Sequence, residues 1–135
     1  MTMPLLPQAV LTKNAPQPIG PYSQAIRAGN LVFCSGQIAL DPVSGQVVGA
    51  ADVEAQTEQV MKNLVAVLEA ASCSLKNVVK TTIFLKSMND FPKVNAIYGR
   101  FVEQAGGIAP ARSTIEVARL PKDVLVEVEA IAQLS

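Results

Sequence analysis

Residues 53–105, VEAQTEQVMKNLVAVLEAASCSLKNVVKTTIFLKSMNDFPKVNAIYGRFVEQA, hold two segments of helical period on either side of a β-branched run. Apolar residues recur every three or four positions over 53–71 and again over 91–105, as on one face of a helix. Residues 78–85 are instead β-branched and nearly continuous, which predicts a strand buried on much of both faces. Asp52 can cap the first helix through its side-chain oxygen. The segment therefore predicts helix, strand, helix.

Shorter apolar runs on both sides extend this pattern into an α+β domain. We predict strands at 23–27, 31–35, 46–48, 113–118 and 124–132. In the last strand every second residue is apolar, so one of its faces should pack on the core. The resulting order, βββαβαββ, predicts two layers: a mainly antiparallel sheet with both helices on one face.

The length and composition fit a single folded domain. The chain has 135 residues, and half of them are apolar, which is enough for a core and argues against disorder. We predict a loose N-terminal extension over residues 1–13 and one domain over residues 14–135.

The charge content bears on partners and on compartment. Eleven basic and eleven acidic residues give zero net charge, so nucleic acid is not expected as the main partner. Charged residues make up 16% of the chain, against about 25% in typical domains, so we expect another copy to cover apolar surface. No apolar run approaches the ~18 residues of a membrane span, and no membrane partner is expected. Cys34 and Cys73 are interpreted as buried free thiols, so a cytoplasmic location is predicted.

The absence of histidine narrows the possible chemistry. A Ser-His-Asp or Cys-His triad needs an imidazole to carry a proton, and the chain has none. A zinc site needs three or four ligands, which two cysteines cannot supply, so no metal is expected. Arginine, lysine, carboxylates, hydroxyls, thiols and the backbone remain.

Three segments combine restrained backbone with a polar group, and each allows a structural alternative. Tyr22 follows Gly20-Pro21 and either presents its hydroxyl to a ligand or packs at the domain edge. Ser35-Gly36 ends an apolar strand, where close backbone approach could admit a carboxylate, or where an ordinary bulge could lie. Arg112 follows Pro110 at the start of a strand and is a candidate bidentate clamp for a carboxylate.

Glu127 is unusual because it lies in an otherwise apolar strand, so it should be partly buried and in need of a partner. From the residue types alone, two interpretations stay open. Glu127 and Arg112 could belong to a functional site, or Glu127 could form a structural ion pair with Arg112 or Arg119.

The same segments resemble one known family. IGPYSQA (19–25), SGQI (35–38), VKTTIFLKSMNDFPKVN (79–95), PARSTIEVARLPKD (110–123) and VEVEAIA (126–132) are similar to the reactive-intermediate deaminase family, RidA or YjgF. The resemblance covers residues 14–132. It implies a chorismate-mutase-like fold, a homotrimer, and ligand sites in the clefts between subunits. It also implies hydrolysis of 2-aminoacrylate, 2-iminopropanoate and 2-iminobutanoate to 2-oxo acids and ammonia, which protects enzymes that use pyridoxal phosphate.

The resemblance also implies roles for individual residues. Arg112 would bind the substrate carboxylate, and Glu127 would position or activate the attacking water. The pocket would be lined by Tyr22, Ser35, Gly36, Asn95 and Thr114. Many family members carry a cysteine where this chain has Thr114, so thiol-based regulation is in doubt here. No cofactor is expected, because an imine carbon is already electrophilic.

We therefore expect a cytoplasmic, cofactor-free 2-iminobutanoate/2-iminopropanoate deaminase that acts as a homotrimer on small 2-imino acids. One alternative is a trimeric protein that binds 2-oxo acids, with a regulatory role and no turnover. A ribonuclease is a further alternative, against which the zero net charge and the missing histidine argue.

Overall fold

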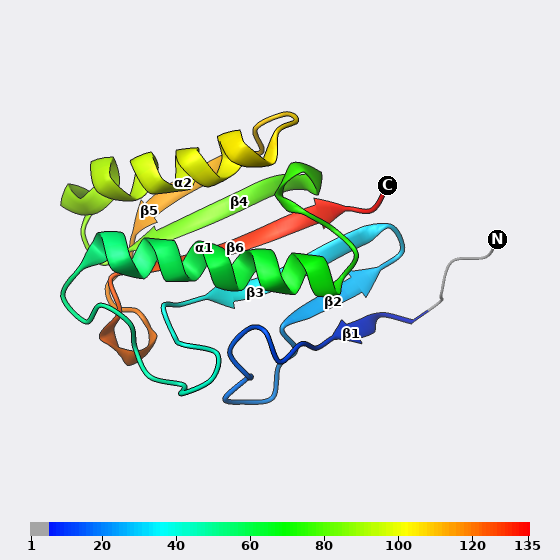
Figure 1. Cartoon of the computed structure of the whole chain (residues 1–135), viewed down its shortest axis with the longest axis horizontal. Coiled ribbons are helices and arrows are strands. Elements are labelled where there is room, and N and C mark those ends of the chain that lie inside the picture. The colour runs from blue at the N-terminus through cyan, green and yellow to red at the C-terminus, as the bar shows by residue number, and fades with distance from the viewer. Residues whose placement is uncertain (1–5) are drawn as a thin grey trace.

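One six-stranded sheet with two helices on one of its faces forms the protein (Figure 1). The computed structural model describes residues 6–135. Its strands lie in the order β1-β2-β3-β6-β4-β5, and every neighbouring pair is antiparallel except β4 and β5. The elements are β1 (Gln8–Val10), β2 (Ala25–Ala28), β3 (Leu31–Gln37), α1 (Val53–Ala70), β4 (Val78–Leu85), α2 (Phe91–Ala105), β5 (Ala111–Glu116) and β6 (Val126–Gln133). The predicted two-layer α+β architecture is confirmed.

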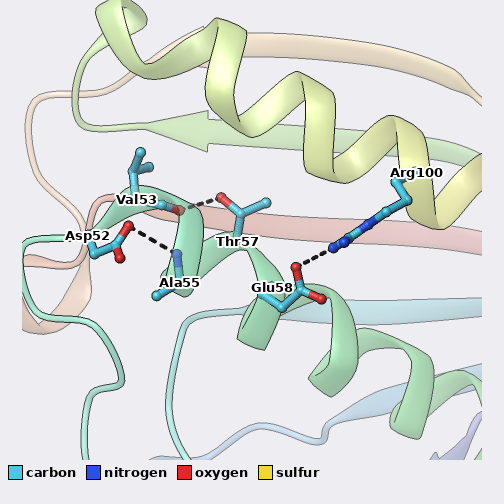
Figure 2. Close-up of polar contacts among 6 residues, drawn as sticks. All are labelled: Asp52, Val53, Ala55, Thr57, Glu58 and Arg100. Carbon is cyan, nitrogen blue, oxygen red and sulfur yellow. Dashed lines mark hydrogen bonds and ion pairs between the residues drawn. The ribbon is translucent and has the colours of Figure 1, made fainter.

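Helix α1 begins where its capping residue predicts. Asp52 Oδ1 accepts the backbone N–H groups of Glu54 and Ala55, at 3.0 and 3.2 Å. These bonds satisfy donors that the first turn would otherwise leave open. An ion pair between Glu58 and Arg100 links α1 to α2 (Figure 2).

The core lies between the helices and the sheet. On β6 every second residue from Val126 to Ala132 is buried, as the alternation predicts. Five apolar residues of α1 in the same core are completely buried: Val60, Met61, Leu64, Val67 and Leu68. Full burial of such a side chain stabilises the fold by about 1.5–3 kcal/mol, so this layer holds the sheet and helices together.

Two sequence predictions about the first half of the chain need correction. Residues 8–10 are not loose: they form edge strand β1, paired with β2, while residues 1–5 lie outside the described part. Residues 46–48 form no strand but a single bridge, Leu40 to Val47. Asp41 accepts the N–H groups of Val43 and Ser44 and folds this segment into a turn.

The last strands also differ from the prediction. The predicted strand 113–118 is β5, two residues earlier in the chain, at 111–116. In the sheet, β4 lies between β5 and β6 and pairs with both. The run 78–85 is buried on one face only within this chain: Val79 is exposed, while Ile83 and Leu85 are buried.

The face of the sheet away from the helices, called the open face here, mixes apolar and polar residues. Register places Phe33, Phe84, Ile115 and Ile131 on it, together with Lys80, Thr82, Glu127 and Glu129. Phe33 and Ile115 are each more than 40% exposed. Within residues 6–135, no helix combines the length and the apolar character that crossing a membrane requires.

Candidate functional site

A cavity of about 400 Å³ gathers four of the predicted site residues: Tyr22, Ser35, Gly36 and Glu127. Its walls come from the end of β3, the start of β6 and the loop that precedes β2. The rest of the lining is mostly apolar or amide: Pro16, Gln17, Ile19, Gln24, Gln37, Ile38, Leu40 and Pro121. Tyr22 is half exposed at this cavity, so it is not simply packed at the domain edge.

Ser35 and Gly36 form a bulge in β3. The register with β6 shifts between Cys34 and Gln37. Ser35 is held there twice, because its N–H donates to the Gln24 carbonyl at 3.0 Å and its hydroxyl donates to the Ser23 carbonyl at 2.6 Å. The bulge that the sequence allowed as an alternative is therefore present, and it forms one wall of the cavity.

Gly36 leaves the space that the Glu127 carboxylate occupies. A Cβ at position 36 would lie 2.1 Å from Glu127 Oε2 and 2.8 Å from Glu127 Cδ. Any residue larger than glycine would therefore push this carboxylate away.

Glu127 itself is half-buried, and its partner is not an arginine. Arg119 binds Asp123 through two hydrogen bonds, at 2.7 and 3.1 Å, and Arg112 donates to Asn95, so the structural ion pair that the sequence left open as an alternative is not formed. Burial first, and then the charge of Glu129, raise the pKa of Glu127 above its ordinary value of 4.5. A carboxylate with a raised pKa is a better proton acceptor near neutral pH.

Arg112 lies in a second cluster, between β5 and α2. Its Nη1 donates to Asn95 Oδ1 at 2.7 Å. Its Cζ lies 5.3 Å from the ring centroid of Phe91 and 5.2 Å from that of Tyr98. Thr114 follows two residues later on the same face, and its buried Oγ1 has no hydrogen-bond partner among the described residues. This cluster presents a guanidinium that remains exposed and can still bind an anion.

The two clusters lie on opposite faces of the sheet. Arg112 is in register with Thr81, which is buried under the helices, whereas Glu127 is in register with Phe84 on the open face. The two backbones are three residues and two strands apart, roughly 14 Å by standard strand spacings. A small ligand therefore cannot contact Arg112 and Glu127 of one chain together.

Sequence reasoning missed the residues that support these clusters. Phe91 and Tyr98 belong to the apolar face that the helical period over 91–105 predicts, but their rings also contact Arg112. Gln24 is buried in the cavity wall, where it donates to the carbonyls of Thr12 and Pro16. No feature of the sequence distinguishes such supporting residues from ordinary core.

The chemistry available at these clusters is that of a guanidinium and a proton-accepting carboxylate. Among the described residues, no three His, Cys, Asp or Glu side chains gather to hold a metal ion. An arginine can bind a carboxylate through two parallel N–H donors and fix its orientation. A partly desolvated glutamate can take a proton from water.

Comparison with known proteins gives a family match over residues 12–134, to the family described as Endoribonuclease L-PSP. Among curated relatives, the Synechocystis RutC family protein slr0709 is 57% identical, over 93% of this chain and 95% of the relative. The Salmonella typhimurium 2-iminobutanoate/2-iminopropanoate deaminase is 50% identical, over 93% of this chain and 96% of the enzyme.

Solved structures share the fold over nearly the whole chain. YyfA from Yersinia pestis, of the conserved Rid protein family, has a TM-score of 0.91 and 47% identity and covers 96% of this chain and all of its own. Escherichia coli TdcF with bound serine has a TM-score of 0.90 and 41% identity and covers 95% of this chain and 99% of its own.

Proposed function

This chain belongs to the Endoribonuclease L-PSP family, which includes the RidA and YjgF proteins, and from that membership we propose that it is an imine deaminase. Its substrates would be 2-aminoacrylate with its tautomer 2-iminopropanoate, and 2-iminobutanoate. The products would be 2-oxo acids and ammonia, and removal of the reactive enamine and imine substrates would protect enzymes that use pyridoxal phosphate. The observation that carries the proposal is the half-buried Glu127 carboxylate in the space beside Gly36, at the wall of a mostly apolar cavity.

The reaction needs orientation and one proton acceptor. Arg112 holds the substrate carboxylate, and Glu127 takes a proton from a water molecule as the water oxygen bonds to the imine carbon. As the C–O bond forms, the C=N π electrons move to the nitrogen, which takes a proton from solvent, so the resulting carbinolamine has four single bonds at this carbon. Glu127 then gives its proton to the same nitrogen. The C–N bond breaks and ammonia leaves, while the hydroxyl loses its proton to solvent and the C=O bond of the 2-oxo acid forms. Because the imine carbon is already electrophilic, no covalent nucleophile is required.

The two clusters act on one substrate if they come from different subunits. We propose a homotrimer in which Arg112, Asn95 and Thr114 of one subunit face Tyr22, Ser35, Gly36 and Glu127 of its neighbour. Two observations support this arrangement: the clusters lie on opposite faces of the sheet, and the open face carries exposed apolar residues such as Phe33 and Ile115. Substrate would then bind in the clefts between subunits.

The cytoplasm is the compartment that we propose. Cys34 and Cys73 are both buried free thiols, which suits a reducing environment.

A coupled assay tests the proposed reaction. A threonine dehydratase supplies 2-iminobutanoate, and semicarbazide traps the imine that remains. We expect the wild type to reduce semicarbazone formation and Arg112→Ala to abolish this effect. Arg100→Ala is the matched control, because Arg100 is a partly exposed arginine of α2 that pairs with Glu58. Equal rates for the wild type and Arg112→Ala would contradict the proposal.

A second candidate function is binding of small carboxylates without turnover. The bound serine of TdcF favours it, because serine carries a carboxylate on a three-carbon chain. Calorimetric titration with 2-oxobutanoate, together with the coupled assay, distinguishes the deaminase from a binding protein. If 2-oxobutanoate binds but imine hydrolysis stays at the background rate, the binding function is supported. Cleavage of RNA, which the family's descriptive name suggests, finds no support in a chain with zero net charge and no histidine.

A further inference from the structure

Three residues of α2 form a cradle around the Arg112 side chain. Phe91, Asn95 and Tyr98 follow one another at spacings of four and three, which places them on one face of the helix. Asn95 Oδ1 accepts from Arg112 Nη1 at 2.7 Å, and both rings have their centroids within 5.3 Å of Arg112 Cζ. Both distances are within the ~6 Å range of cation–π attraction.

The Tyr98 ring is itself fixed from the sheet. Its Oη lies 2.7 Å from Thr81 Oγ1, and both residues are buried, at 5% and 1% exposure. Thr81 lies beside Arg112 in the sheet, since β4 and β5 pair at these two positions. The strand that carries Arg112 and the ring that contacts its guanidinium are therefore tied to the same residue of β4.

We infer that Tyr98 is a positioning residue for Arg112, and that it acts through its buried ring. The inference rests on the proposed function, in which Arg112 binds the substrate carboxylate. An exposed arginine samples many rotamers. Binding of a carboxylate fixes one of them, and the conformational entropy that the side chain loses weakens the binding. The cradle lowers this cost before the ligand arrives, because Asn95 holds one edge of the guanidinium and both rings contact it.

The direct test measures Arg112 itself, without any ligand. In ¹⁵N-labelled protein the Nε–Hε signal of Arg112, assigned by its loss in Arg112→Lys, should be displaced by the ring currents of the cradle. Tyr98→Leu should move it toward the position of a free arginine, and Tyr98→Phe, which keeps the ring, should not. Phe101→Leu is the matched control, because it removes an α2 ring that stacks on Arg100 instead.

Ligand binding gives the functional arm. Titration with 2-oxobutanoate should show Kd raised about fivefold by Tyr98→Leu, the loss expected for one cation–π contact near the surface. In the coupled assay KM should rise with kcat nearly unchanged, because Arg112 would hold the carboxylate equally in the ground state and the transition state. A purely structural role would instead lower kcat through the folded fraction and leave Kd unaltered.

The two arms separate the possible failures. An unmoved Arg112 signal together with an unchanged Kd in Tyr98→Leu would overturn the positioning role. If the wild type binds no 2-oxo acid and hydrolyses no imine, the proposed function is wrong. The Arg112 signal then still shows whether Tyr98 orients the Arg112 side chain. Should Tyr98→Leu not fold, Phe91→Leu removes the other ring and must displace the same signal. The double variant Thr81→Val/Tyr98→Phe removes both hydroxyls and keeps the ring, so it should retain most of the affinity.

Discussion

Replacing Gly36 with alanine should strongly reduce activity while leaving the fold intact. The backbone accepts alanine there, because Gly36 is not among the glycines with positive φ. The only obstacle is Glu127, whose Oε2 would lie 2.1 Å from the new Cβ, where ordinary contact begins at 3.4 Å. The carboxylate must therefore retreat by about 1 Å or more, and it can, since it is the free end of a flexible side chain.

The magnitude follows from this displacement. A misplacement of about 1 Å in a reacting group costs on the order of 10²-fold in rate, so kcat/KM of Gly36→Ala should fall by that factor. Stability should change by less than about 1 kcal/mol, because the loss of glycine freedom in the unfolded chain offsets the displaced side chain.

The assay is imine hydrolysis by the dehydratase-coupled method, with thermal unfolding of the same samples. Gly99→Ala is the matched control: nothing lies within 4 Å of its new Cβ, so activity should be kept and the helix stabilised by about 0.5–1 kcal/mol. In a Glu127→Ala background, Gly36→Ala should have no further effect on rate. A Gly36→Ala protein with the wild-type rate would refute the assignment of Glu127 as proton acceptor.

The remaining predictions concern single side chains. Arg112→Lys should weaken binding of 2-oxobutanoate about tenfold in calorimetry, because an ammonium cannot make the two parallel contacts of a guanidinium; equal affinity would count against a bidentate carboxylate site. Since burial and then Glu129 raise the pKa of Glu127, the folded state holds this proton more tightly than the unfolded state. The stabilisation present below pH 4.5 is then lost as pH rises through the raised pKa, and urea unfolding of Glu127→Gln should lack this decline. Asp52→Ala should lower the free energy of unfolding by about 1 kcal/mol, through the two lost N-cap bonds, and leave the rate of imine hydrolysis unchanged.

Local patterns predicted the helices and the central strand well. Apolar period, the Asp52 cap and the β-branched run at 78–85 depend on neighbours in sequence, and the structure places α1, β4 and α2 within one residue of the prediction. Strand β1 was not predicted, because it has only three residues at the edge of the sheet and pairs only with β2. Three residues are too few to show the alternation of apolar and polar side chains that indicates a strand. The neighbours of β5 were not predicted either, since pairing across a crossover depends on tertiary packing.

The candidate site, like the fold, could be predicted from the sequence only in part. Tyr22, Ser35, Gly36 and Glu127 meet at one cavity, as the sequence suggested. Local patterns could not reveal that Arg112 lies on the other face of the sheet, because that depends on the register of β5 against β4. The contacts of Tyr98 with Thr81 and Arg112 are likewise set by packing, and an apolar stripe with a tyrosine in it predicts only a core position.

The most direct test of the account is complementation between two inactive variants. Arg112→Ala and Glu127→Ala chains, each inactive alone, are co-expressed in equal amounts, and all the trimers that form, the homotrimers included, are purified together. If each site takes Arg112 from one subunit and Glu127 from its neighbour, random mixing leaves both residues intact at one site in four, so about one quarter of the wild-type rate should return. If both residues act within one chain, every site carries a lesion, and mixed trimers without activity would contradict the account.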